Sequence, residues 1–246
     1  MSEDWLFDLG NTRLKFAPLR DDIADIHALP HDASAWQAGL PRGDTAYLAC
    51  VAAAELRVGL LDALTQRFRR IAIARTARSF AGLRIAYTDP SKLGVDRFLA
   101  MLGARGIAED AVLVVGVGTA LTIDVVDASG QHRGGRIAPS PTLMRESLHR
   151  RAAQLPEAGG TYVEFADDTE AALASGCEGA ALALIEHSLV HATRLLRQAP
   201  ALLLHGGGSD DLRAHLAGAR HEPALVLRGL AAWANALREA PPATAA

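Results

Sequence analysis

The sequence predicts an α/β protein that consists of two copies of one domain, each with the layout βββαβαβα. Three observations support this prediction. Apolar residues alternate with a period of two in short segments and recur with a helical period in longer ones, which indicates strands and helices. The same order of elements occurs twice, with a boundary between residues 110 and 111. The length of 246 residues suits two domains of about 100 to 130 residues each.

The N-terminal half, residues 1–110, begins with three short strands and continues with alternating helices and strands. Turn-forming residues separate the apolar segments, and Pro90 is typical of the start of a helix. We expect strands at residues 5–9, 13–19, 22–29, 45–50 and 71–75, and helices at residues 33–40, 53–68 and 91–106.

The C-terminal half, residues 111–246, repeats this order. We expect strands at residues 112–116, 120–127, 134–138, 201–206 and 224–229, helices at residues 141–155, 169–197 and 209–218, and a closing helix. In each half a glycine-containing turn joins the first two strands. We expect these two turns to hold one nucleotide in a cleft between the domains, where small-molecule sites often lie.

The composition favours a protein that binds small molecules. The formal net charge is -3 and the pI is about 6.3, so no basic excess attracts nucleic acid or an anionic membrane. Cys50 and Cys177 are far apart in sequence and lack the spacing of a zinc site or of a disulfide framework, so we expect buried free thiols. No signal peptide or membrane span is evident, and we expect a cytoplasmic protein.

The first candidate site is the stretch DLGNTRLK, from Asp8 to Lys15. A glycine lets the backbone approach a ligand closely, and successive amides with the Asn11 and Thr12 side chains can donate to phosphate oxygens. Asp8, at the end of a strand, can hold a divalent cation through oxygen. The alternative is an ordinary hairpin with Gly10 and Asn11 as turn residues.

The second candidate site is the turn from Gly116 to Thr119, within VVGVGTALTID. A strand followed by Gly-x-Gly is typical of dinucleotide-binding proteins, but that fingerprint needs a helix directly after the glycines. Here Leu121 begins an alternating, strand-like segment, so a dehydrogenase is excluded. The sequence Gly-x-x-x-x-Gly-Lys-Ser/Thr is also absent, which excludes a P-loop enzyme.

Two further stretches carry polar or glycine residues at helix starts. Asp96 and Arg97 lie on an otherwise apolar helix. They could serve as a catalytic carboxylate and an anion-binding guanidinium. The alternative is that Asp96 pairs with Lys92 at i,i+4 on a solvated helix face. Gly206, Gly207 and Gly208 follow an apolar strand, where they either leave room for a flat ring or form a flexible turn. The histidines have no evident serine partner, so hydrolysis by a nucleophilic serine is not expected.

Together these stretches resemble the type III pantothenate kinases over nearly the whole chain. DLGNTRLK is similar to the first phosphate motif of that family, GVDR to its substrate motif, GTALTID to most of its second phosphate motif and HGGG to its adenosine motif. The resemblance implies two ribonuclease-H-like domains of the actin-like ATPase and sugar kinase superfamily. It also implies an ATP- and Mg²⁺-dependent kinase that phosphorylates pantothenate, the first step of coenzyme A biosynthesis, and a homodimer whose partner closes the pantothenate pocket.

The resemblance assigns roles to individual residues. Asp96 is implied as the general base. The pantothenate site is implied to comprise Tyr87, Gly94, Val95, Asp96, Arg97 and Thr169. The ATP and Mg²⁺ site is implied to comprise Asp8, which also binds the metal, with Leu9, Gly10, Asn11, Thr12, Arg13, Leu14, Lys15, Thr119, Gly206, Gly207 and Gly208.

One residue departs from the family pattern. The second phosphate motif usually begins with an aspartate that is associated with a monovalent cation such as potassium or ammonium, and this chain has Gly116 there, while Asp124 remains. We therefore expect a kinase with weakened or altered dependence on potassium. The alternatives are a non-enzymatic accessory protein that retains the kinase fold, and a kinase for another small alcohol.

Overall fold

The computed structural model describes residues 3–239, which form two compact units. The first unit comprises residues 3–109 together with residues 224–239, and the second comprises residues 110–223. The division after residue 109 lies one residue from the predicted boundary. Within residues 3–239, no helix is both long enough and apolar enough to cross a membrane.

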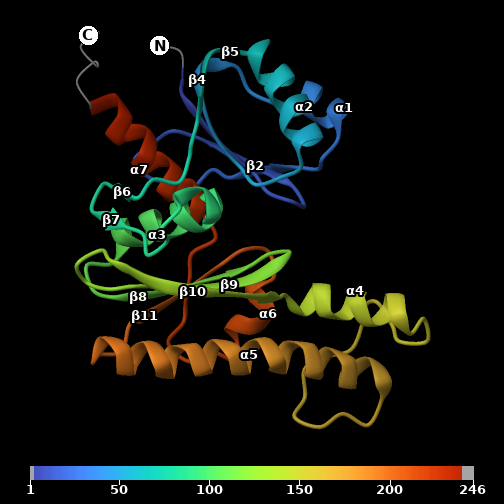
Figure 1. The fold of residues 1–246 in the computed structure, drawn as a ribbon. Helices are drawn as coiled ribbons and strands as arrows, with labels where there is room; N and C mark the ends of the chain where they lie inside the picture. Colours follow the sequence, from blue (N-terminus) through green and yellow to red (C-terminus); the bar gives the residue numbers. More distant parts are fainter. Residues whose placement is uncertain (1–2, 240–246) are drawn as a thin grey trace. The chain divides into compact units, whose positions relative to one another are not determined.

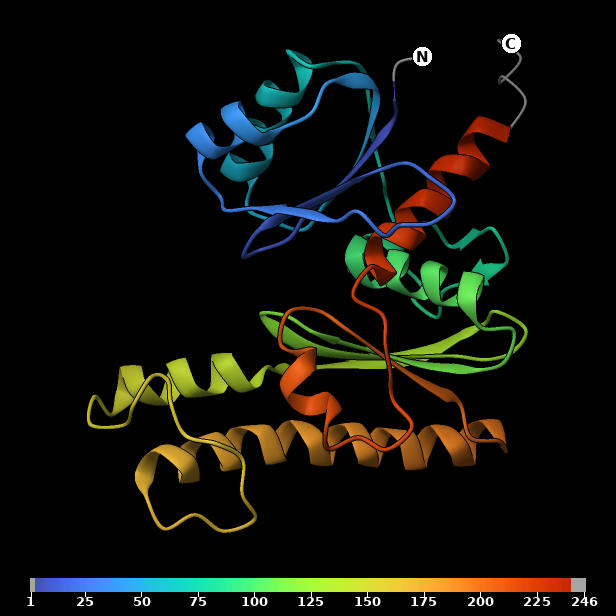
Figure 2. The same ribbon diagram turned by 180° about the vertical axis from the view of Figure 1, so that it is seen from behind.

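The first unit contains a five-stranded sheet with helices packed on it (Figure 1). The strand order is β3-β2-β1-β4-β5, in which β1 is antiparallel to β2 and parallel to β4. Phe7 and Leu48 from the sheet pack in one apolar core with Trp36 of α1 and with Leu60 and Leu64 of α2. Figure 2 shows these two helices side by side on one face of the sheet. The bounds are β1 Trp5–Leu9, β2 Leu14–Pro18, β3 His27–Leu29, α1 Ala33–Gly39, β4 Gly43–Cys50, α2 Ala54–Thr65 and β5 Phe68–Ile73.

The polypeptide after β5 forms a small hairpin and a helix that belongs to the same unit. The hairpin consists of β6 (Ser79–Phe80) and β7 (Leu83–Arg84), and the helix is α3 (Val95–Ile107). The sequence predicted one helix over residues 91–106, but a short 3-10 helix, η1 (Pro90–Lys92), comes first. Leu93 and Gly94 interrupt the helix because both have extended backbone angles, so α3 begins directly before Asp96.

The closing helix α7 (Leu225–Glu239) corrects two predictions. Residues 224–229 were expected as a strand and α7 as part of the C-terminal domain, but residues 225–239 are helical and pack on α3. The two helices approach so closely that a Cβ on Gly229 would lie 1.8 Å from the carbonyl oxygen of Leu99, and one on Gly103 would lie 2.3 Å from that of Leu225. These glycines permit a contact between segments far apart in sequence.

The second unit repeats the sheet of the first. Its strand order is β10-β9-β8-β11-β12, which is the same topology and confirms the duplicated layout. Helix α5 lies along one face of this sheet (Figure 1) and packs with Ala181 and Ile185 against Leu113, Val115 and Leu204. The bounds are β8 Val112–Val117, β9 Ala120–Val126, β10 His132–Pro139, α4 Pro141–Arg151, α5 Thr169–Leu196, β11 Ala201–His205, α6 Ser209–Arg213 and β12 Arg220–His221.

Several bounds in the two units differ from the predictions. The third strand begins at His27 rather than at residue 22, α4 ends at Arg151, and α6 ends at Arg213. The fifth strand of the second sheet is the two-residue β12, which no prediction included. Both cysteines are free as expected, but only Cys177 is buried, while Cys50 is partly exposed. Burial raises the pKa of the Cys177 thiol.

Candidate functional site

The first candidate loop joins β1 to β2 in the first unit. Asp8 lies opposite Lys15 in the antiparallel register, so both side chains point to the same face of the sheet. Their neighbours Phe7 and Leu9 point to the other face, into the core with α1 and α2. The loop residues Asn11, Thr12 and Arg13 are exposed. The loop therefore places exposed residues beside one acid and one base, and phosphate binding by this loop stays a prediction.

Asp8 is held in an environment that disfavours its charge. Its pKa is raised from 3.8 to about 7, chiefly by burial and secondly by the nearby Asp96 carboxylate, against a smaller opposing effect of Lys15. Asp96 belongs to α3, so the unit brings together a strand-end acid and a helix-start acid that are 88 positions apart in the sequence. Two acids that repel each other in a partly buried place form a site that a cation stabilises.

The start of α3 fixes the direction of the Asp96 side chain. Gly94 caps the helix, and Oδ1 of Asp96 accepts a hydrogen bond of 2.8 Å from the backbone amide of Arg97. An acid in the first turn of a helix is favoured by the helix dipole. Lys92 lies in η1, outside α3, so the alternative of a Lys92–Asp96 pair on one helical face is wrong.

Arg97 and Tyr87 lie together, as the predicted substrate site requires. The Arg97 side chain is buried, and its Nη1 donates to the Tyr87 hydroxyl at 3.2 Å. The guanidinium carbon also lies 5.9 Å from the centre of the Tyr87 ring, within cation–π range. A buried guanidinium fixed by an aromatic side chain is suited to binding an anionic group.

The second candidate loop is the turn between β8 and β9 in the second unit. Gly118 and Thr119 are exposed at the tip of this hairpin, and the Thr119 carbonyl accepts a hydrogen bond of 3.0 Å from Oγ of Ser140. Two residues earlier, the Val117 carbonyl accepts a 3.0 Å hydrogen bond from the amide of Gly208. The hairpin turn and the triple glycine are thus directly linked.

Gly116 lies in a space that two other side chains fill. A Cβ at this position would lie 2.7 Å from Oγ1 of Thr122 and 2.8 Å from Nε2 of His205. The cross-strand register explains this, because His205 and Thr122 lie on either side of Gly116 on neighbouring strands. No carboxylate fits at position 116 unless His205 moves. His205 is the first residue of the HGGG stretch, but its contact with position 116 depends on the pairing of β8 with β11 and was not predicted from the sequence.

The remaining acid of this motif, Asp124, lies away from the turn. Its Oδ1 is 3.0 Å from Nε2 of His132, and both side chains are buried. Asp124 therefore belongs to a buried pair between β9 and β10, and it does not replace the acid that is missing at position 116.

The three glycines at positions 206–208 differ in what the backbone requires of them. Gly206 has a positive φ of 95°, and a Cβ there would lie 2.3 Å from the Val117 carbonyl oxygen. A Cβ on Gly208 would lie 3.0 Å from Cγ1 of Val117. A Cβ on Gly207 would meet no atom within 4 Å. The backbone conformation and close packing explain why position 206 needs a glycine, whereas the open space at Gly207 fits the predicted approach of a flat ring.

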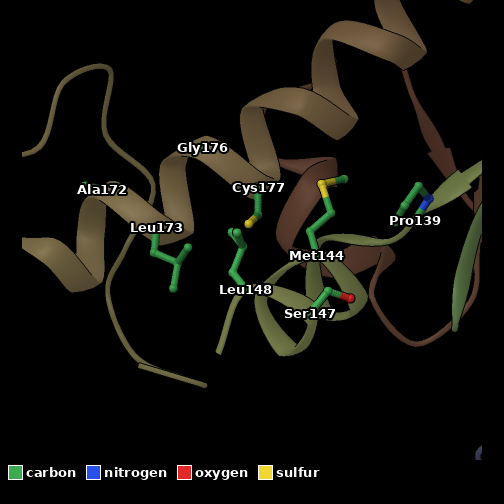
Figure 3. A pocket seen from close by; sticks show the side chains of 8 residues that line it. All are labelled: Pro139, Met144, Ser147, Leu148, Ala172, Leu173, Gly176 and Cys177. Carbon is green, nitrogen blue, oxygen red and sulfur yellow. The ribbon is translucent and has the colours of Figure 1, made fainter. Parts of the chain in front are cut away.

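Thr169 lies in the second unit, as the first residue of α5, whereas the other residues of the predicted pantothenate site lie in the first. The next turns of the same helix face an apolar groove of about 420 Å³ between α4 and α5. Figure 3 shows Met144 and Leu148 of α4 opposite Leu173 and Cys177 of α5. Leu148 is 42% exposed, which is high for a leucine beside an apolar groove.

The donor set fits Mg²⁺ bound together with a phosphorylated ligand. Among residues 3–239, no three His, Cys, Asp or Glu residues are grouped as for a protein-caged metal. Mg²⁺ is usually held by one or two carboxylates, phosphate oxygens and water. The Asp8 carboxyl, with its raised pKa and the neighbouring Asp96, matches that pattern.

Comparison with known proteins indicates a kinase family. The type III pantothenate kinase family matches this chain over residues 5–191. A type III pantothenate kinase of Stenotrophomonas maltophilia (strain R551-3) is 58% identical over 236 residues, which cover 94% of this chain and 97% of that protein.

Two solved structures share the fold. One from Campylobacter jejuni, described as a conserved Baf family transcriptional activator, has a TM-score of 0.64 and 21% identity, covering 96% of this chain and 98% of that one. One from Sinorhizobium meliloti, described as a 2-dehydro-3-deoxygalactonokinase, has a TM-score of 0.58 and 12% identity, covering 96% and 99%. The likeness to these two structures confirms the predicted fold class of paired ribonuclease-H-like domains.

Proposed function

Because the chain belongs to the type III pantothenate kinase family, we propose that it transfers the γ-phosphoryl group of ATP to the primary hydroxyl of pantothenate. The products are ADP and 4'-phosphopantothenate, and the reaction is the first step of coenzyme A biosynthesis. The observation that carries this proposal is the placement of Asp96, an acid oriented at the start of α3 and close to Asp8 and Arg97.

Asp96 acts as the general base. As the bond from the pantothenate oxygen to the γ-phosphorus forms, the bond from that phosphorus to the β–γ bridging oxygen breaks, and the hydroxyl proton passes to Asp96. The hydrogen bond from the Arg97 amide keeps the carboxylate in one orientation. Phosphoryl transfer passes through a loose transition state, so alignment and charge neutralisation supply most of the rate enhancement.

The first loop binds the phosphates and the metal. Asp8 holds Mg²⁺, and the exposed amides of residues 10–13 with Lys15 neutralise phosphate charge. Mg²⁺, when bound, draws negative charge from the phosphate oxygens. Thr119 contacts phosphate from the second unit, and Gly207 lies against adenine, which the open space at that residue supports.

Pantothenate is bound by Tyr87, Gly94, Val95 and Arg97, with Thr169 completing the site. Pantothenate carries a carboxylate, and the buried Arg97 guanidinium held by the Tyr87 hydroxyl supplies a matching cation. This arrangement favours pantothenate over a neutral small alcohol. A panel of pantothenate, glycerol, pantetheine and sugar acids in an ADP-release assay tests it, and equal turnover of neutral alcohols would refute the proposed substrate.

Potassium dependence is weakened or altered in this proposal. Position 116 has no carboxylate to bind a monovalent cation, and Thr122 and His205 fill the adjacent space. We expect comparable kcat/KM values in potassium, ammonium and sodium salts at equal ionic strength. A steep requirement for potassium would contradict this part of the proposal.

The proposed state is a cytoplasmic homodimer, since the reaction consumes cytoplasmic ATP and the exposed apolar groove between α4 and α5 favours a contact with a second copy. Light scattering measures the molar mass of the wild type and of Leu148→Asp in solution. A monomeric wild type would refute the proposed homodimer. The accessory-protein alternative predicts nucleotide binding with no turnover of any alcohol in the same assay.

A further inference from the structure

We propose that His221 and Ser209 are positioning residues that hold the glycine loop, residues 206–208, in its nucleotide-binding shape. The inference rests on the proposed function for the identity of the ligand. Neither residue belongs to the motifs that the sequence analysis identified. Ser209 is the first residue of α6, directly after the loop, and His221 lies on the neighbouring β12.

The hydrogen bonds form a chain from β12 to the loop. Oγ of Ser209 donates to the Gly206 carbonyl at 2.7 Å, and the same hydroxyl lies 3.0 Å from Nε2 of His221. Because the hydroxyl proton is already directed at the carbonyl, Ser209 accepts in its contact with His221, and the Nε2–H of the imidazole donates.

This series of hydrogen bonds is not a hydrolytic triad, although Asp210 lies 3.5 Å from Nδ1 of His221. The prediction that the histidines lack a serine partner is wrong, since Ser209 contacts His221. However, the Ser209 side chain is fully buried, and its proton is directed away from the imidazole. A buried hydroxyl without access to a substrate cannot act as a nucleophile, so the contact has a structural effect on the loop.

The loop depends on such support because Gly206 has a conformation that few residues adopt. Its φ is 95°, and its carbonyl accepts from both the amide and the hydroxyl of Ser209. The other side of the loop is fixed by the hydrogen bond from Gly208 to Val117. His221 itself is held by parallel pairing with Leu204 and by the hydrogen bond from Glu222 to Leu204. The hydrogen bonds through Ser209 and His221 thus connect the glycine loop to the edge of the sheet.

The test compares His221→Ala, His221→Gln, Ser209→Ala and the double alanine variant, with Asp210→Asn as the control. Glutamine can place an amide N–H near the position of Nε2. Asp210 is 71% exposed and contacts His221 at Nδ1, not at Nε2, so Asp210→Asn leaves the hydrogen bond between Nε2 and Ser209 in place. The probe is ADP, with dissociation constants from calorimetry, and hydrogen exchange reports on the amides of residues 206–209.

His221→Ala should weaken ADP binding about threefold to tenfold, the factor expected for loss of one neutral hydrogen bond. The KM for ATP should rise in parallel, and the KM for pantothenate should stay within about twofold. The loop amides should exchange faster, His221→Gln should restore binding, and the double variant should be no weaker than the weaker single variant, because both act through one chain.

The inference is overturned if His221→Ala binds ADP within about twofold of the wild type. It is also overturned if His221→Ala weakens the binding of both substrates and lowers Tm, and His221→Gln restores neither the binding nor Tm. That pattern would indicate general destabilisation. If the wild type binds ADP but does not phosphorylate pantothenate, the proposed function fails while the ADP measurements still decide this inference.

Discussion

The contact between α3 and α7 predicts opposite effects for two glycine-to-alanine substitutions. In Gly229→Ala the new Cβ would lie 1.8 Å from the Leu99 carbonyl oxygen, a backbone atom that cannot rotate away. Overpacking of this kind costs about 1 to 3 kcal/mol, and we expect the upper end. Alanine recovers about 1 kcal/mol of helix propensity, so the net loss is about 2 kcal/mol.

Gly106→Ala is the matched control, because Gly106 lies in α3 and a Cβ there would meet no atom within 4 Å. It should stabilise the protein by up to about 1 kcal/mol. Scanning calorimetry should show Tm about 4 to 8 °C lower for Gly229→Ala and unchanged or higher for Gly106→Ala. If both variants melt at the wild-type temperature, or if both lose stability equally, the close helix contact is refuted.

Two further predictions concern the candidate site. Asp8→Asn removes a carboxyl whose pKa is raised from 3.8 to about 7, chiefly by burial. Such an acid destabilises the fold increasingly as pH rises from about 4 to 7, so the Tm advantage of Asp8→Asn in the absence of nucleotide should grow between pH 5 and 8; a constant difference would contradict the raised pKa. Gly207→Ala should raise the KM for ATP with little change in Tm, whereas Gly206→Ala should lower Tm, because only position 206 has a positive φ and a backbone atom 2.3 Å from the new Cβ. Equal melting temperatures for these two variants would refute the distinction.

The hairpins and the long helices could be predicted from the sequence because their signals are local. Alternating apolar residues around Gly10 and Gly118 indicate paired strands, and α5 extends over residues 169–196, close to the predicted range. The order of these elements, together with four motifs, was sufficient for the fold and the family. The residues around Asp8 and Asp96 were also identified, since each lies within a recognisable motif.

The errors concern features that depend on distant contacts. Residues 224–229 begin with four consecutive apolar residues, which also suits a short buried strand. Gly229 allows α7 to pack on α3, and that partner is more than 100 positions away in sequence. The two-residue strand β12 is too short to have a period. His221 carries no motif signal, and the HGGG motif does not indicate that His205 lies beside position 116, because both placements follow from the pairing of β11 with β8 and β12.

The most direct test of the central claim compares kcat of Asp96→Asn with that of the wild type, with ADP affinity measured on the same samples. Asp110→Asn, the same substitution at an exposed position, is the control. If Asp96 is the base, kcat for pantothenate should fall about 100-fold or more while ADP affinity stays within about twofold. An Asp96→Asn enzyme that retains more than about a tenth of the wild-type kcat would contradict the claim.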